Sequence, residues 1–202
     1  MSAVQRITLP APAIDRGEVL RYMKCATPTP ELTALITQAA QELAPLLEYK
    51  VCYCTFPIER GQTGLNFANI TTDSRDLAKA LAGCDRILLF AATLGLAPDR
   101  LLAKYGHISP AKALCVQAIG AERIEALCNT FVDMLDEQLR ATGAHLRPRF
   151  SPGYGDLPLS TQRELFALLD CPRQIGLCLN ESLLMSPTKS VTALAGIQPN
   201  EA

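Results

Sequence analysis

The spacing of hydrophobic and polar positions divides the chain into helical and extended segments. Apolar residues recur at alternating steps of four and three between Leu114 and Leu139, which predicts one long amphipathic helix over residues 110–142. We expect shorter helices over 15–23, 29–48, 73–81 and 98–105. Runs of β-branched and apolar residues predict strands over 51–58, 65–70, 86–93, 146–150, 175–178 and 190–197.

The order of these elements predicts the fold class. Helices and strands do not alternate strictly, which favours a single α+β domain over 1–202 with a mixed or antiparallel sheet and flanking helices. We expect 1–48 to be a helical N-terminal segment and 198–202 a loose tail. The strands over 51–58 and 65–70 are expected to be neighbours around a turn at 60–62.

Composition narrows the class of protein. The chain has 202 residues, 49% of them hydrophobic, which is enough for one substantial core. A net charge of −1 gives no electrostatic footprint for nucleic acid. The longest apolar run, over 87–97, is too short to span a bilayer, which needs about 20 residues. Pro10, Pro12 and Asp15 stand where a signal peptide needs an apolar stretch, so we expect a cytoplasmic protein that does not bind membranes.

The eight cysteines do not predict a metal site. No pair has the C-x-x-C spacing, and the chain has two histidines. Cys52 and Cys54 are expected on one face of a strand as small core residues. We expect reduced thiols and no metal.

Candidate chemistry is concentrated in the segment 149–155, Arg-Phe-Ser-Pro-Gly-Tyr-Gly, which follows the long helix. Glycine lets the main chain approach a ligand closely, and the guanidinium of Arg149 can hold a carboxylate with two parallel N–H donors. The segment is interpreted as a ligand loop. The alternative for Tyr154 is a turn tyrosine whose ring packs on the core.

A carboxylate interrupts the apolar stripe of the long helix. Seven of its eight positions are apolar and one is Glu125; the stripe comprises Leu114, Ala118, Ala121, Glu125, Cys128, Val132, Leu135 and Leu139. Burial of an unpaired carboxylate costs on the order of several kcal/mol of folding free energy. Glu125 is therefore expected either to pair with an arginine such as Arg123 or Arg149, or to sit at an edge position in water, or to face a ligand cleft.

Two later segments add a family resemblance to the ligand loop. An Asn-Glu-Ser segment follows at 180–182 and a Ser-Val-Thr-Ala strand at 190–193. In this order the chain resembles the activation domain of cobalamin-dependent methionine synthase, in its free-standing, shorter form, most closely over 147–197. The aromatic hairpin that follows the Ser-Val-Ser strand in the long form has no counterpart after Ile197.

The resemblance implies a binding site for S-adenosylmethionine. Arg149 would pair with the carboxylate of the ligand and Glu125 with its ammonium group. The ring of Tyr154 would lie against the sulfonium or adenosyl group, and main-chain groups of Ser151 and Gly153 would hydrogen-bond the adenine edge. No catalytic residue is expected, because the cobalt of the partner is the nucleophile.

The resemblance also implies a function and partners. The chain would be a reactivation subunit that presents the methyl group of S-adenosylmethionine to cob(I)alamin during reductive methylation. The cobalamin would be carried by a methionine synthase or related corrinoid protein, and a flavodoxin-like reductant would supply the electron indirectly. The chain alone is expected to be inert.

Two alternatives remain at this point. One is a noncatalytic module that recognises a corrinoid protein without binding the methyl donor. The other is an S-adenosylmethionine-dependent methyltransferase that acts on a small molecule, although the chain lacks the glycine-rich strand-loop-helix opening of that class.

Overall fold

A five-stranded antiparallel sheet forms the centre of the molecule. The computed structural model describes residues 3–61 and 64–200. Within the sheet the strand order is β1-β2-β6-β10-β7. The strands are β1 (Gln5–Thr8), β2 (Lys50–Pro57), β6 (Arg86–Thr93), β10 (Ser190–Pro199) and β7 (Ala144–Leu146). The predicted α+β class, with helices flanking an antiparallel sheet, is confirmed.

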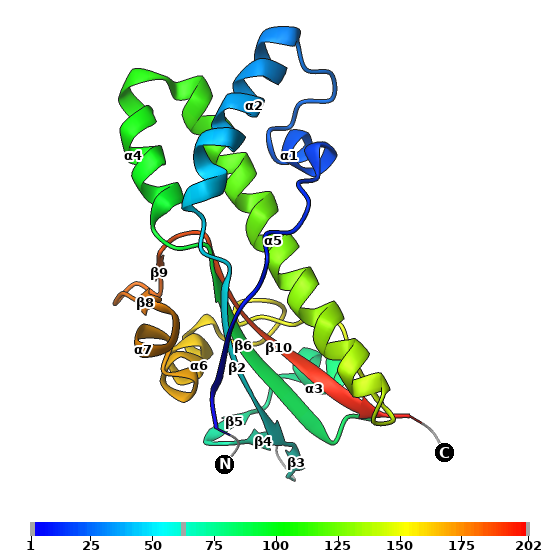
Figure 1. The fold of residues 1–202 in the computed structure, drawn as a ribbon. Helices are drawn as coiled ribbons and strands as arrows, with labels where there is room; N and C mark the ends of the chain where they lie inside the picture. Colours follow the sequence, from blue (N-terminus) through cyan, green and yellow to red (C-terminus); the bar gives the residue numbers. More distant parts are fainter. Residues whose placement is uncertain (1–2, 62–63, 201–202) are drawn as a thin grey trace.

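Both faces of this sheet are covered. Helix α5 (Pro110–Arg140) runs along one face (Figure 1), and Phe131 of this helix packs on Phe90 with ring centroids 5.1 Å apart. The opposite face is covered by three short helices and a small sheet: α3 (Arg75–Ala80), α6 (Gln162–Leu169), α7 (Cys171–Ile175), β3 (Glu59–Arg60), β4 (Leu65–Phe67) and β5 (Ile70–Thr72). Because it is buried on both sides, β6 is apolar at consecutive positions from Ile87 to Ala92.

A helical lobe extends beyond one end of the sheet (Figure 1). The first half of α5 packs there on α1 (Arg16–Tyr22), α2 (Pro30–Leu43) and α4 (Ala97–Ile108), around a separate buried cluster. A short 3₁₀ turn, η1 (Ala44–Leu46), leads from α2 back to the sheet. Thr29 caps α2 by accepting a hydrogen bond from Leu32 N at 3.3 Å, and Pro30 occupies its first turn, as the sequence predicts.

Several elements differ from the sequence-based expectation. Strand β2 pairs with β1 and β6, whereas residues 65–70 contribute β4 and the first residue of β5 in the small sheet, so the predicted pairing of 51–58 with 65–70 is wrong. Gln62, in the turn predicted between them, lies outside the described residues. The N-terminal 48 residues include strand β1 as well as helices. Residues 175–178 end α7 and begin β8 (Cys178–Leu179) instead of forming one strand, and α6 and α7 were not predicted.

Strand β10 borders a cavity at its first residues. Its side chains alternate, so that Ala193 and Ala195 face α5 while Leu194 faces the core under α6. Its last residues still pair with β7, so Gln198 and Pro199 continue the strand instead of beginning a loose tail. Its first residues, 190–192, lie beside the helical lobe, where the sheet leaves space between α5 and α6.

A polar cluster ties three helices of the lobe together. Glu42 of α2 accepts hydrogen bonds from Tyr105 Oη at 2.7 Å, from Lys104 Nζ at 3.0 Å and from Lys112 Nζ at 2.7 Å. The Lys112 ammonium group, followed by Tyr105 and Lys104, lowers the pKa of the Glu42 carboxyl to about 2.

We expect this cluster to contribute to stability in a pH-dependent manner. The folded-state pKa of Glu42 lies below its ordinary value of 4.5, so its contribution is fully present above pH 4.5 and is lost as the pH falls towards 2. Glu42→Gln should lower the free energy of unfolding by about 1 kcal/mol at pH 7, and the difference from the wild type should shrink below pH 4.5. Urea unfolding of both proteins at pH 7 and pH 3 measures this. A constant difference at both pH values would contradict it.

Membrane-crossing helices and three-ligand metal clusters are both missing from the described part of the chain. Within residues 3–61 and 64–200, no helix combines the length and apolar character needed to cross a membrane. In the same residues, no group of three His, Cys, Asp or Glu side chains is arranged to hold a metal ion. Cys52 and Cys54 are buried in the same core cluster, on one face of β2.

Candidate functional site

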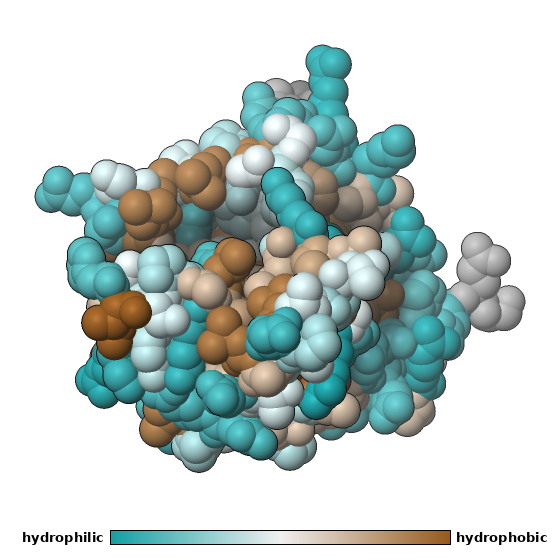
Figure 2. All heavy atoms as spheres, turned by 90° about the horizontal axis from the view of Figure 1, so that it is seen from above, coloured by the Kyte–Doolittle hydropathy of each residue, from teal (hydrophilic) through white to brown (hydrophobic). Residues whose placement is uncertain are grey.

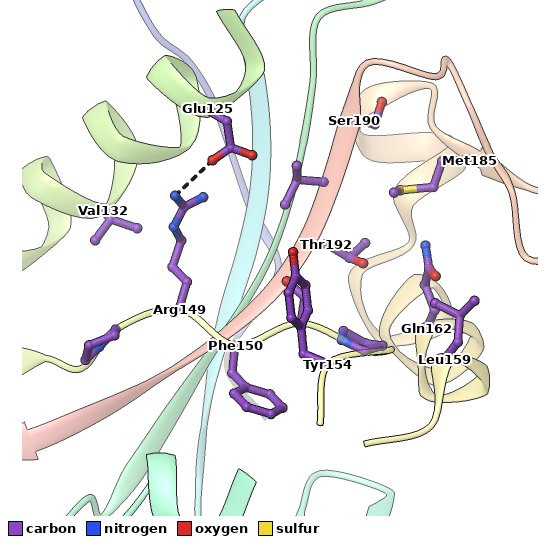
Figure 3. Close-up of a pocket in the computed structure, with 14 residues that line it drawn as sticks. Glu125, Val132, Arg149, Phe150, Tyr154, Leu159, Gln162, Met185, Ser190 and Thr192 are labelled. Atoms are coloured by element: carbon purple, nitrogen blue, oxygen red, sulfur yellow. Dashed lines mark hydrogen bonds and ion pairs between the residues drawn. The ribbon is translucent and has the colours of Figure 1, made fainter. Parts of the chain in front are cut away.

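A cavity of about 720 Å³ opens where the helical lobe meets the sheet. Its walls come from five segments, shown in Figure 3. They are the middle of α5, the loop after β7, the turn η2 (Leu159–Thr161) with the first residue of α6, the hairpin of β8 and β9 (Met185–Ser186), and the first residues of β10. A volume of this size is typical of sites for small molecules.

The loop after β7 forms one wall and is fixed to the central sheet. Phe150 and Leu194 exchange both main-chain hydrogen bonds, at 2.8 and 2.7 Å, so the loop continues the pairing of β10 at this point. Gly153 then turns the chain at φ +90°, a conformation that favours glycine. Its N–H donates to Leu157 O at 2.9 Å, and Tyr154 N donates to Ser151 O at 3.1 Å.

The far end of the same loop is fixed to helix α3. The carboxylate of Asp156 accepts hydrogen bonds from Arg75 N at 2.8 Å and Asp76 N at 3.2 Å, and from the hydroxyl of Ser74. The Ser74 hydroxyl, followed by these N–H groups, lowers the pKa of the Asp156 carboxyl, so the contact persists in its charged form. The loop is therefore held at both ends before any ligand arrives.

An ion pair stands at one end of the cavity. Arg149 Nη2 donates to Glu125 Oε2 at 3.2 Å and to Asn129 Oδ1 at 2.8 Å (Figure 3). Both charged side chains are partly exposed and line the cavity. The two predicted residues of opposite charge, which lie 24 positions apart in the sequence, thus meet at one place.

Glu125 is not the buried carboxylate of α5. Its side chain is 44% exposed, whereas Glu122, one turn earlier, is buried. The buried residues of α5 differ from the predicted apolar stripe. The first half of the helix packs on other helices and the second half on the sheet, so its buried face changes direction along its length. Leu114, expected in the stripe, is exposed, and Phe131, outside it, is buried.

Glu122 and Arg123 form a buried ion pair that holds the N-terminal segment against α5. Arg123 donates to the carbonyl oxygens of Pro12 at 2.6 Å and Ala13 at 2.7 Å, and Glu122 accepts from Asp15 N at 3.1 Å. These three main-chain groups precede helix α1, and all find their partners in one ion pair. The pair fixes the segment beside the turn of α5 that carries Glu125.

The other predicted site residues lie at different depths. Tyr154 stands at the mouth of the cavity and is 68% exposed, and Ser151 contributes to the wall. The N–H of Gly153 already serves the turn of the loop, so this donor does not face the cavity. Gly153 also supplies the positive φ that the turn requires.

Sequence reasoning missed two polar residues at the end of the cavity away from the ion pair. Gln162, the first residue of α6, is 3% exposed, and Thr192 of β10 is 5% exposed. Both line the cavity (Figure 3), and neither side chain hydrogen-bonds to any residue among those described. Because the sequence did not predict a helix over 162–169, the direction of the Gln162 side chain could not be predicted either.

Among the described residues that line the cavity, none is a cysteine or a histidine. Cys128 is close to Arg149 and Glu125, but burial raises the pKa of its thiol to about 12, so it stays protonated at neutral pH. The arrangement is suited to binding. An anion and a cation at one end match a zwitterionic amino acid, and the polar side chains at the other end match a second hydrogen-bonding group.

Comparisons with known proteins point to one family. The family model described as "Vitamin B12 dependent methionine synthase, activation domain" matches residues 76–202. The crystal structure of the MetH reactivation domain bound to AdoHcy is similar in fold, with a TM-score of 0.72 at 18% sequence identity. The similarity covers 99% of this chain and 80% of that chain. No curated protein matches the sequence.

Proposed function

This chain belongs to the activation-domain family of vitamin B12-dependent methionine synthase, and we propose that it binds S-adenosylmethionine and presents its methyl group to a cobalamin-bearing partner. The proposed form is a reactivation subunit separate from the synthase, as the sequence resemblance implies. The observation that carries the proposal is the ion pair of Arg149 and Glu125 at one end of a 720 Å³ cavity.

The ion pair suits the amino-acid end of the ligand. An α-amino acid brings a carboxylate and an ammonium group on one carbon, so it can insert between Arg149 and Glu125 and give each a partner of opposite charge. Arg149 would hold the carboxylate with two parallel donors, and Glu125 would accept from the ammonium group. Asn129, which already accepts from Arg149 at 2.8 Å, would keep the guanidinium in place.

The mouth of the cavity suits a protein partner. Tyr154 and Leu159 both line the cavity and both expose large parts of their side chains. Seen from the helical end, the surface carries further apolar side chains among polar ones (Figure 2). A docked partner would cover this apolar rim and exclude water from the methyl group, while the ring of Tyr154 would contact the sulfonium.

The residues of this chain would act by positioning. The partner's cobalamin supplies the nucleophile, so this chain needs neither a base nor a nucleophile of its own. Arg149 and Glu125 would fix one end of the ligand and leave the methyl group at the open mouth, beside Tyr154. The cytoplasmic location and the flavodoxin-like reductant belong to the same proposal.

Two measurements test this function. Calorimetric titration of the wild-type chain with S-adenosylmethionine should give saturable binding. Transfer of a labelled methyl group from S-adenosylmethionine should require a corrinoid protein together with a reductant, and should not occur with the chain alone. Absence of binding would favour a docking module, and methyl transfer to small molecules without a corrinoid would favour an ordinary methyltransferase; either result would refute the proposal.

A further inference from the structure

The polar groups around the cavity differ in whether they already have partners. Arg149 is paired with Glu125 and Asn129, and the hydroxyl of Ser190 bonds to Thr93 Oγ1 and Pro187 O, both at 2.8 Å. The N–H of Gly153 is bonded to Leu157 O. At the end of the cavity away from Arg149, the side chains of Gln162 and Thr192 have no such hydrogen bonds among the described residues.

Gln162 and Thr192 are nearly buried, and neither side chain makes a hydrogen bond within residues 3–61 and 64–200. Both side chains line the open cavity and their polar atoms are not fully enclosed by protein, so a ligand group can reach them. The two side chains come from different elements, α6 and β10, and meet the same cavity. Their convergence makes two hydrogen-bonding side chains available to the same ligand group.

The surroundings of Gln162 indicate which group this is. Figure 3 shows its amide between Leu159 and Met185, on the opposite side of Tyr154 from Arg149. Apolar and sulfur-containing side chains suit the faces of an aromatic ring, and the amide offers one acceptor beside one donor. This pair matches the N6 amino group and N7 of adenine, which glutamine recognises with two hydrogen bonds.

We propose that Gln162 is the residue by which this site selects adenine, with Thr192 as an additional polar contact to the adenosyl group. This inference rests on the proposed function, because it assumes that the amino-acid end of the ligand lies at Arg149. It moves adenine recognition from the main chain of Ser151 and Gly153 to a side chain of α6. The amide oxygen of Gln162 would accept from the N6 amino group, and its N–H would donate to N7.

The test compares two ligands that differ at one position of the base. S-adenosylhomocysteine has an amino group at C6, and S-inosylhomocysteine has an oxygen, which is an acceptor and leaves the amide oxygen of Gln162 unpaired. The wild type should bind the adenosyl ligand at least about 10-fold more tightly. Gln162→Met, which keeps length and removes the amide, should bring this ratio close to one.

The ratio separates recognition from a structural effect. A change that only disturbs the fold weakens both ligands equally and leaves the ratio unchanged, which would overturn the inference. Gln138→Met, at an exposed glutamine of α5, is the matched control and should keep the wild-type ratio. If Gln162→Met does not fold, Gln162→Leu also removes the amide and should likewise bring the ratio close to one. A wild type that binds neither ligand refutes the proposed function, and this inference with it.

Discussion

Replacing Arg149 with alanine is expected to weaken the binding of S-adenosylmethionine by about 100-fold, equivalent to about 2.7 kcal/mol. The substitution removes the cation that would hold the ligand carboxylate, and it leaves Glu125 facing the cavity without a counter-charge. Arg149→Lys keeps the charge but loses the planar pair of donors, so it should restore only part of the affinity. Calorimetry of the three proteins measures the series.

The control for Arg149 is an arginine of the same domain that lies outside the cavity. Arg173 of α7 is highly exposed, and Arg173→Ala should bind the ligand as the wild type does. Circular dichroism should show the same helix content in all variants, because Arg149 is partly exposed and, among the described side chains, hydrogen-bonds to Glu125 and Asn129 alone. Wild-type affinity in Arg149→Ala would show that the ligand carboxylate binds elsewhere.

Replacing Arg123 with leucine is expected to lower the free energy of unfolding by about 3–5 kcal/mol. The change leaves the carboxylate of Glu122 buried without a cation, and it strips the carbonyl oxygens of Pro12 and Ala13 of their donors. For a domain of this size, each kcal/mol corresponds to roughly 2–4 °C in melting temperature. Urea unfolding measures the free energy of unfolding, and thermal unfolding measures the melting temperature.

Another ion pair on the same helix provides the matched control. Arg140 pairs with Asp136 at 2.6 Å, but its side chain is 66% exposed, compared with 5% for Arg123. Arg140→Leu should therefore cost less than about 1 kcal/mol. The double variant Glu122→Gln, Arg123→Met removes both buried charges and should be more stable than Arg123→Leu. Equal losses in Arg123→Leu and Arg140→Leu would contradict the argument.

Sequence patterns located one end of the candidate site and missed the other. A guanidinium next to Pro and Gly is a local signal, and Glu125 was visible as a polar interruption in an apolar stripe. Their contact across 24 positions depends on α5 and the β7 loop lying side by side, and only the fold shows it. Gln162 carried no signal, because a glutamine in a short helical segment is usually a surface residue.

The sheet was predictable to a similar extent. Strands β6 and β10 are long, apolar and fully covered, so their composition identified them. Strand β1 has only four residues, mostly exposed, and its pairing with β2 bridges about 45 positions, which no local pattern encodes. The buried pair Glu122–Arg123 was not predicted because its partners are main-chain groups of a distant segment.

Because the loop over 149–157 is anchored at Phe150 and Asp156, the entropy cost of ordering it is met when the domain folds and not when a ligand binds. The loop becomes ordered when the domain folds, because its anchors are a strand of the sheet and the start of α3. A ligand then meets a loop with little freedom left to lose, so ordering does not oppose binding. Affinity in this domain is thus coupled to the local rigidity of β10 and α3, and substitutions far from any ligand atom can change it by releasing the loop.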